Sequence, residues 1–99
     1  MLNLDQIKPA IKDLCTRLRV KRLDIFGSAT TERFAPDSDV DVLVVFERDG
    51  DGLFDRYFDL KEALEQIFKR KVDLITEASV KNPYFKQEIE RTKRNVYAA

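Results

Sequence analysis

The segment from Val40 to Phe46 constrains the fold most, because it is apolar at every position except Asp41. Side chains alternate between the two faces of an extended strand. One face of this segment therefore carries only apolar residues, and the other carries Asp41 followed by Leu43 and Val45. A strand that is apolar on both faces beyond its first residues is typical of a sheet that is covered on both sides. We predict such a strand over residues 39–47.

The rest of the chain alternates between helical and extended patterns. Apolar residues at helical spacing predict helices over residues 4–18 and 53–68, and Pro9 is expected to delay or kink the first of them. Short apolar runs predict strands over residues 23–26 and 71–76, and a short helix is expected to begin at Ser28. Asn82-Pro83 has the form of a helix start, and the stripe after it predicts a final helix through Phe85, Ile89, Thr92 and Val96. The order α-β-α-β-α-β-α predicts one domain over residues 1–99 of the α/β (α+β) class, a small mixed β-sheet with helices packed on it.

The composition excludes several kinds of chemistry. The chain has no histidine, which removes histidine-based acid–base catalysis, Ser-His triads and the usual zinc sites. A single cysteine, Cys15, excludes an internal disulfide and is expected to be a small buried residue. With 18 basic and 18 acidic residues the net charge is zero, which argues against direct nucleic-acid binding. No apolar stretch is long enough for a signal sequence or a membrane span, so we expect a cytoplasmic protein.

Three aspartates carry the candidate chemistry. Asp39 and Asp41 share one face of the predicted strand, a spacing that suits chelation of a hard divalent cation such as Mg²⁺. Asp73 interrupts an otherwise apolar strand, where an unpaired charge would be costly, so we expect it to join them as a third metal ligand. A two-metal site for phosphate transfer needs about three such carboxylates. In a chain without histidine, Asp73 is also the candidate general base.

A Gly27-Ser28 turn follows the first predicted strand. Gly27 permits a close approach to the backbone, and the hydroxyl and amide of Ser28 at a helix start suit phosphate binding. Each motif is weak alone, because most Asp-x-Asp pairs are turn or cap residues and Asp73 alone is better explained by an ion pair. Their combination at the ends of predicted strands is more specific. Asp24 is expected to face solvent, and Tyr57 to pack with its hydroxyl in water.

These motifs resemble those of the minimal nucleotidyltransferases of the polymerase-β superfamily, over nearly the whole chain. The matching segments are Phe26-Gly27-Ser28, Ser38-Asp39-Val40-Asp41-Val42-Leu43-Val44 and Lys71-Val72-Asp73-Leu74-Ile75-Thr76. The resemblance implies a polymerase-β-like fold in which Gly27 and Ser28 bind the triphosphate of ATP. It also implies that Asp39, Asp41 and Asp73 are the catalytic residues and bind Mg²⁺, with two ions present when ATP is bound.

One segment departs from the pattern of that family. Many members carry a basic residue followed by glycine soon after the Gly-Ser turn, whereas residues 29–33 contain no glycine. Arg33 is the candidate for the missing positive charge and thus for nucleotide binding.

Members of this size are commonly paired with HEPN-domain ribonuclease toxins, and some silence the toxin by transferring AMP from ATP to one of its tyrosines. The resemblance therefore implies an antitoxin with adenylyltransferase activity and a HEPN toxin as partner. The alternative is a binding module that neutralises the toxin by occlusion alone, through the basic first helix or the aromatic-rich helix over residues 53–68. A transferase acting on nucleic-acid ends fits the neutral charge less well. Self-association is left open by the sequence.

Overall fold

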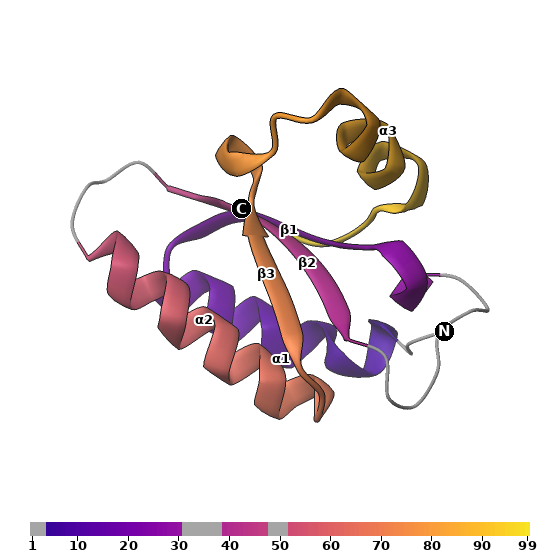
Figure 1. The fold of residues 1–99 in the computed structure, drawn as a ribbon. Coiled ribbons are helices and arrows are strands. Elements are labelled where there is room, and N and C mark those ends of the chain that lie inside the picture. The colour runs from indigo at the N-terminus through magenta and orange to yellow at the C-terminus, as the bar shows by residue number, and fades with distance from the viewer. Residues whose placement is uncertain (1–3, 31–38, 48–51) are drawn as a thin grey trace.

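The computed structural model describes residues 4–30, 39–47 and 52–99 (Figure 1). Four strands form one mixed sheet in the order β3-β2-β1-β4. The central strand β1 (Val20–Phe26) is antiparallel to β2 (Val40–Phe46) and to β4 (Arg94–Ala98), whereas β2 and β3 (Val72–Thr76) run parallel. The mixed sheet predicted from the sequence is confirmed.

Helices cover the two faces of the sheet unequally. The helices α1 (Leu4–Arg17) and α2 (Leu53–Phe68) lie on one face, and the shorter α3 (Pro83–Thr92) lies over the other (Figure 1). Short 3₁₀ helices, η1 (Gly27–Thr30) and η2 (Glu77–Ser79), follow β1 and β3. Within the described residues, no helix is both long and apolar enough to cross a membrane.

The main core lies between the sheet and the pair α1 and α2. Val40, Val42 and Val44 face this core, as the alternation in the sequence predicts, and each is at most 1% exposed. A smaller cluster on the opposite face joins the sheet to α3 through Phe26, Leu43, Val80 and Ile89. Cys15 is fully buried in the main core, and burial raises the pKa of its thiol to about 12, so the thiol stays protonated.

The first helix runs from Leu4 to Arg17 with Pro9 inside it, so the expected late start is wrong. Proline lacks the N–H that would bond to the carbonyl of Asp5. Both residues are exposed, so water can satisfy the carbonyl, and the apolar stripe through Ile11 and Leu14 holds the helix on the sheet.

The predicted final helix is also corrected, because α3 ends at Thr92 and residues 94–98 form β4. Val96 fits a helical stripe with Ile89 and also fits the alternation of a strand. Ile89 belongs to the cluster beneath α3, whereas Val96 packs in the main core on the other side of the sheet. One helix cannot reach both faces, so the chain turns at Lys93 and pairs with β1, which would otherwise be an edge strand.

Candidate active site

The sheet brings the three predicted aspartates together on the face that carries α3. Asp41 of β2 pairs with Asp73 of β3 in the parallel register, and Val40 pairs with Val72. Asp39 lies two residues before Asp41, so its side chain shares the face of Asp41. The N–H of Val40 donates a hydrogen bond to the carbonyl of Lys71 at 3.0 Å, which fixes the beginning of β2 against β3.

The electrostatics of this cluster centre on Asp41. Asp39 and Asp73 are exposed, and Asp41 is half-buried between them. The pKa of Asp41 is raised above its ordinary value, first by burial and then by the charges of Asp73 and Asp39. Asp73 is therefore not the buried charge that its apolar strand suggests. It lies exposed on an edge strand, beside the half-buried Asp41.

The cluster suits a divalent cation that also binds substrate. In residues 4–30, 39–47 and 52–99, no three acidic or cysteine side chains are arranged to hold a metal ion by themselves. Mg²⁺ is usually bound by one or two carboxylates together with substrate phosphates and water. Repulsion among the three carboxylates, visible in the raised pKa of Asp41, is relieved by such a cation. The donor set thus fits Mg²⁺ bound together with a nucleotide.

The Gly27 turn lies directly against Asp41. Gly27 has φ +73°, and a Cβ atom placed on it would lie 2.5 Å from the Oδ2 atom of Asp41. Any other residue would therefore be strained at this position and would collide with the carboxylate. Ser28 is the second residue of η1, which matches the short helix expected there. Arg33, the other predicted nucleotide-binding residue, lies outside the described residues.

Threonine hydroxyls hold both peptide groups of Gly27. The N–H of Gly27 donates to the Oγ1 atom of Thr92 at 2.9 Å, and the hydroxyl of Thr30 donates to the carbonyl of Gly27 at 2.9 Å. The N–H of Gly27 is thus already engaged within the protein. Gly27 therefore leaves room for the carboxylate of Asp41. The sequence did not indicate that Thr30 and Thr92 hold Gly27 in place.

A polar network on the same face was also missed. Asp24, which was expected to face solvent, is only 2% exposed. Its Oδ2 atom lies 3.2 Å from the Nε atom of Arg22, and its Oδ1 atom accepts a hydrogen bond of 2.9 Å from Asn95. Arg22 also pairs with Glu77, the residue that follows β3. The signal in the sequence is Arg22 two residues before Asp24, which places both on one face of β1.

Tyr57 likewise differs from its prediction. Its hydroxyl donates to the carbonyl of Leu74 at 2.5 Å, which ties α2 to β3. The ring packs at the edge of the main core, as expected, but the hydroxyl is bonded to the protein.

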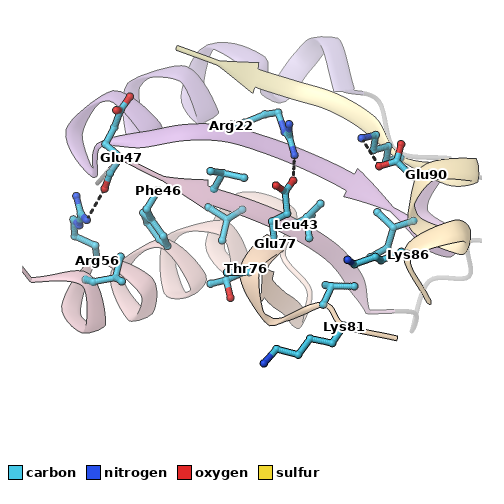
Figure 2. A pocket seen from close by; sticks show the side chains of 17 residues that line it. Arg22, Leu43, Phe46, Glu47, Arg56, Thr76, Glu77, Lys81, Lys86 and Glu90 are labelled. Atoms are coloured by element: carbon cyan, nitrogen blue, oxygen red, sulfur yellow. Dashed lines mark hydrogen bonds and ion pairs between the residues drawn. The ribbon is translucent and has the colours of Figure 1, made fainter. Parts of the chain in front are cut away.

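An open cleft of about 1080 Å³ lies along this face of the sheet, between the end of β2 and α3 (Figure 2). Its floor includes Leu43, two residues beyond Asp41 on the same face, and Val45. Figure 2 shows Arg22 of β1 meeting Glu77 of η2 over this floor, with Lys86 of α3 directed toward it. None of the three aspartates lines this cleft, which comes nearest to Asp41 along β2 at Leu43.

Comparison with known proteins agrees with this geometry. Residues 7–96 match the nucleotidyltransferase domain family. A protein of Methanocaldococcus jannaschii named as a protein adenylyltransferase is 38% identical over 91% of this chain and 94% of its own length. The protein adenylyltransferase MntA of Thermococcus cleftensis is 35% identical over 83% of this chain and 85% of its own length.

Solved structures show the same architecture. The structure of a minimal nucleotidyltransferase superposes with a TM-score of 0.73 at 30% identity, over 94% of this chain and 95% of that chain. A complex of a tri-AMPylated HEPN toxin of Shewanella oneidensis with its MNT antitoxin gives a TM-score of 0.66 at 16% identity, over 97% of this chain and 73% of that chain.

The fold and the carboxylate cluster define a nucleotidyltransferase, and the chain belongs to the nucleotidyltransferase domain family. Within that family, the relatives that match nearly all of it are named as protein adenylyltransferases.

Proposed function

We propose that this protein transfers AMP from ATP to a tyrosine hydroxyl of a partner HEPN ribonuclease toxin, and thereby acts as its antitoxin. The acceptor and the partner are suggested by the relatives: one is named as the protein adenylyltransferase MntA, and one structural neighbour is an antitoxin bound to an AMPylated HEPN toxin. ATP and the toxin meet in the cytoplasm, which is where we expect the protein to act.

The observation that carries the proposal is the register of β2 against β3. It pairs Asp41 with Asp73, while the Gly27 turn comes against Asp41 from the other side. Two adjacent carboxylates do not stabilise a fold, because each negative charge makes ionisation of the other less favourable. Their adjacency is therefore better explained by a function than by stability. Burial first, and then the charges of Asp73 and Asp39, raise the pKa of Asp41 and make its ionisation costly.

The transfer can be written with these residues in named roles. The oxygen of the acceptor hydroxyl attacks the α-phosphorus of ATP, the bond from that phosphorus to the bridging oxygen breaks, and pyrophosphate leaves. Asp73, exposed beside Asp41, accepts the proton of the hydroxyl. Asp39, Asp41 and Asp73 would hold Mg²⁺, which when bound offsets the charge of the phosphates. Ser28 and Arg33 remain the candidates for contacts to the triphosphate.

The position of the label in ATP tests this reaction. The protein is incubated with Mg²⁺, a HEPN-domain ribonuclease as partner, and ATP labelled at either the α- or the γ-phosphate. We expect the α-label on a tyrosine of the partner, located by mass spectrometry, and the γ-label in pyrophosphate. Asp41→Asn should slow the transfer by about 10²-fold or more, because it removes a carboxylate that would hold Mg²⁺ at the phosphates.

A matched variant separates this effect from a change of surface charge. Asp13→Asn alters an exposed aspartate on α1, which lies across the sheet from the site, and should leave the rate unchanged. Absence of α-label on the partner, or γ-label on it instead, would contradict the proposal. So would a normal rate in Asp41→Asn.

Exposed apolar side chains favour a second candidate, neutralisation by occlusion without catalysis. At the beginning of α2, Leu53, Phe54 and Phe58 are 49%, 73% and 49% exposed, and the two phenylalanine rings lie 4.7 Å apart. Such a patch suits a protein partner. If cells producing the toxin are protected by normal amounts of Asp41→Asn, occlusion suffices. If protection is lost, catalysis is required.

A further inference from the structure

Thr92 links the end of α3 to the Gly27 turn. Its side chain is buried, with 8% of the residue exposed. The hydroxyl accepts the N–H of Gly27 at 2.9 Å and donates to the carbonyl of Glu88 at 2.9 Å. One side chain thus satisfies two backbone groups that lie in different elements, and Thr92 and Gly27 are 65 positions apart in the sequence.

The turn that Thr92 holds has little room for displacement. Gly27 lies so close to Asp41 that even a methyl group would meet its carboxylate at 2.5 Å. The turn continues for only the four residues of η1, which begins at Gly27 itself. A shift of Gly27 would therefore change both the place of Asp41 and the direction of the amides that follow.

We propose that Thr92 is a positioning residue, which fixes the Gly27 turn against Asp41 so that triphosphate and carboxylates are held at a productive separation. The proposal rests on the proposed function, since it assigns the turn to the nucleotide. Thr92 itself touches neither ATP nor the acceptor and acts through Gly27. Misplacement of reacting groups by about 1 Å can cost about 10²-fold in rate, so a tether of this kind matters for activity.

Thr16 provides a natural comparison. Its hydroxyl also donates to the carbonyl four residues earlier, that of Lys12, at 2.9 Å, and it is exposed on α1. The two threonines therefore share the bond within the helix and differ in the bond to Gly27. A variant at each position separates the effect of the tether from the effect of the helix bond.

The experiment compares Thr92→Val, which keeps the shape of the side chain but lacks the hydroxyl, with Thr92→Ser and Thr16→Val. Transfer of AMP is measured per folded molecule, as kcat and as KM for ATP. We expect kcat/KM for ATP to fall about 10-fold or more in Thr92→Val, to return near the wild-type value in Thr92→Ser, and to stay unchanged in Thr16→Val. Thr92→Cys, whose thiol is a weak hydrogen-bonding group of similar size, replaces the valine variant if that variant does not fold.

Amide hydrogen exchange at Gly27 supplies a readout that is independent of activity. Protection of this amide should be lost in Thr92→Val and kept in Thr92→Ser. The positioning role is overturned if the valine variant lowers only Tm and the folded fraction, with kcat and KM per folded molecule unchanged.

If the wild-type protein transfers no AMP, the proposed function is wrong. The Kd for the ATP analogue AMP-PNP with Mg²⁺ then decides the role of Thr92. A raised Kd in Thr92→Val, restored in Thr92→Ser, supports positioning of the turn for a nucleotide, and an unchanged Kd refutes it.

Discussion

Asp41 occupies a place where a carboxylate weakens the fold. Burial and the charges of Asp73 and Asp39 all raise its pKa. A group whose pKa is higher in the folded than in the unfolded state favours folding less once it is ionised. This destabilisation is absent at pH values below about 3.9, the pKa of an aspartate in the unfolded chain. It grows as the pH rises through the folded-state pKa and is fully present at neutral pH.

Replacing this charge by an amide of the same shape should therefore stabilise the protein. In the absence of divalent cations at pH 7, we expect Asp41→Asn to have a higher Tm than the wild type, in contrast to its expected loss of transfer rate. The difference should shrink as the pH falls below the ordinary range of aspartate. Thermal unfolding followed by circular dichroism at several pH values measures it, with Asp13→Asn as the control; a lower Tm for Asp41→Asn at pH 7 would refute this reasoning.

For a single residue, the sequence predicts which face of a strand its side chain occupies better than it predicts the contacts of that side chain. Alternation along β2 placed Asp39 and Asp41 on one side and Val40 on the other without reference to any partner strand. The burial of Asp24 depends on Asn95, 71 residues away, which in turn depends on a strand that periodicity alone assigns to a helix. Contacts of this kind follow from the tertiary fold and leave no local pattern.

The helix α3 connects the candidate site to the sheet. Asn82 begins it, and its side-chain oxygen accepts the N–H groups of Tyr84 at 2.9 Å and Phe85 at 3.3 Å. Pro83 occupies the first helical position, as the sequence predicts. The helix then packs Ile89 on the sheet and ends at Thr92.

Loss of this cap should weaken the helix measurably. We expect Asn82→Ala to lower the free energy of unfolding by about 1 kcal/mol, because two N–H groups lose their acceptor. Asn82→Asp retains an acceptor and adds a charge that the helix dipole favours, so it should remain close to the wild type. Urea unfolding of the three proteins measures both effects, and equal stability of all three would contradict the role given to the cap.

The sequence located the start of α3 but not its end. Asn82-Pro83 is a local signal, and local signals survive in any fold. The helix ends before Val96 because Val96 packs in the main core on the far side of the sheet. Val96 can reach that core only because β4 pairs with the free edge of β1. The short strand 94–98 is therefore decided by tertiary packing.

The whole molecule divides its tasks between the two faces of one sheet. The face under α1 and α2 holds the main core, and the face with α3 holds the carboxylates, the Gly27 turn and the cleft. The main core and the candidate site are thus separated by the thickness of a single sheet (Figure 1).

A core substitution on α2 should therefore lower the stability of the protein and leave its transfer activity unchanged. Leu60 is fully buried, so Leu60→Ala should lower the free energy of unfolding by about 2–5 kcal/mol. For the molecules that remain folded, kcat and KM for ATP should be unchanged. Leu53→Ala, on the same helix but 49% exposed, should lose much less stability. A change of KM in Leu60→Ala that exceeds its loss of folded protein would show that the two faces are coupled.

The position of β3 has a further consequence. β3 is an outer strand of the described sheet, so no further described strand lies beyond the exposed Asp73. The protein acceptor of the proposed reaction would approach from this edge of the described sheet. The same openness admits water, which competes with a hydroxyl for activated phosphate. We expect the proposed protein acceptor to exclude water when it covers this edge, so that transfer to its hydroxyl is favoured over hydrolysis of ATP.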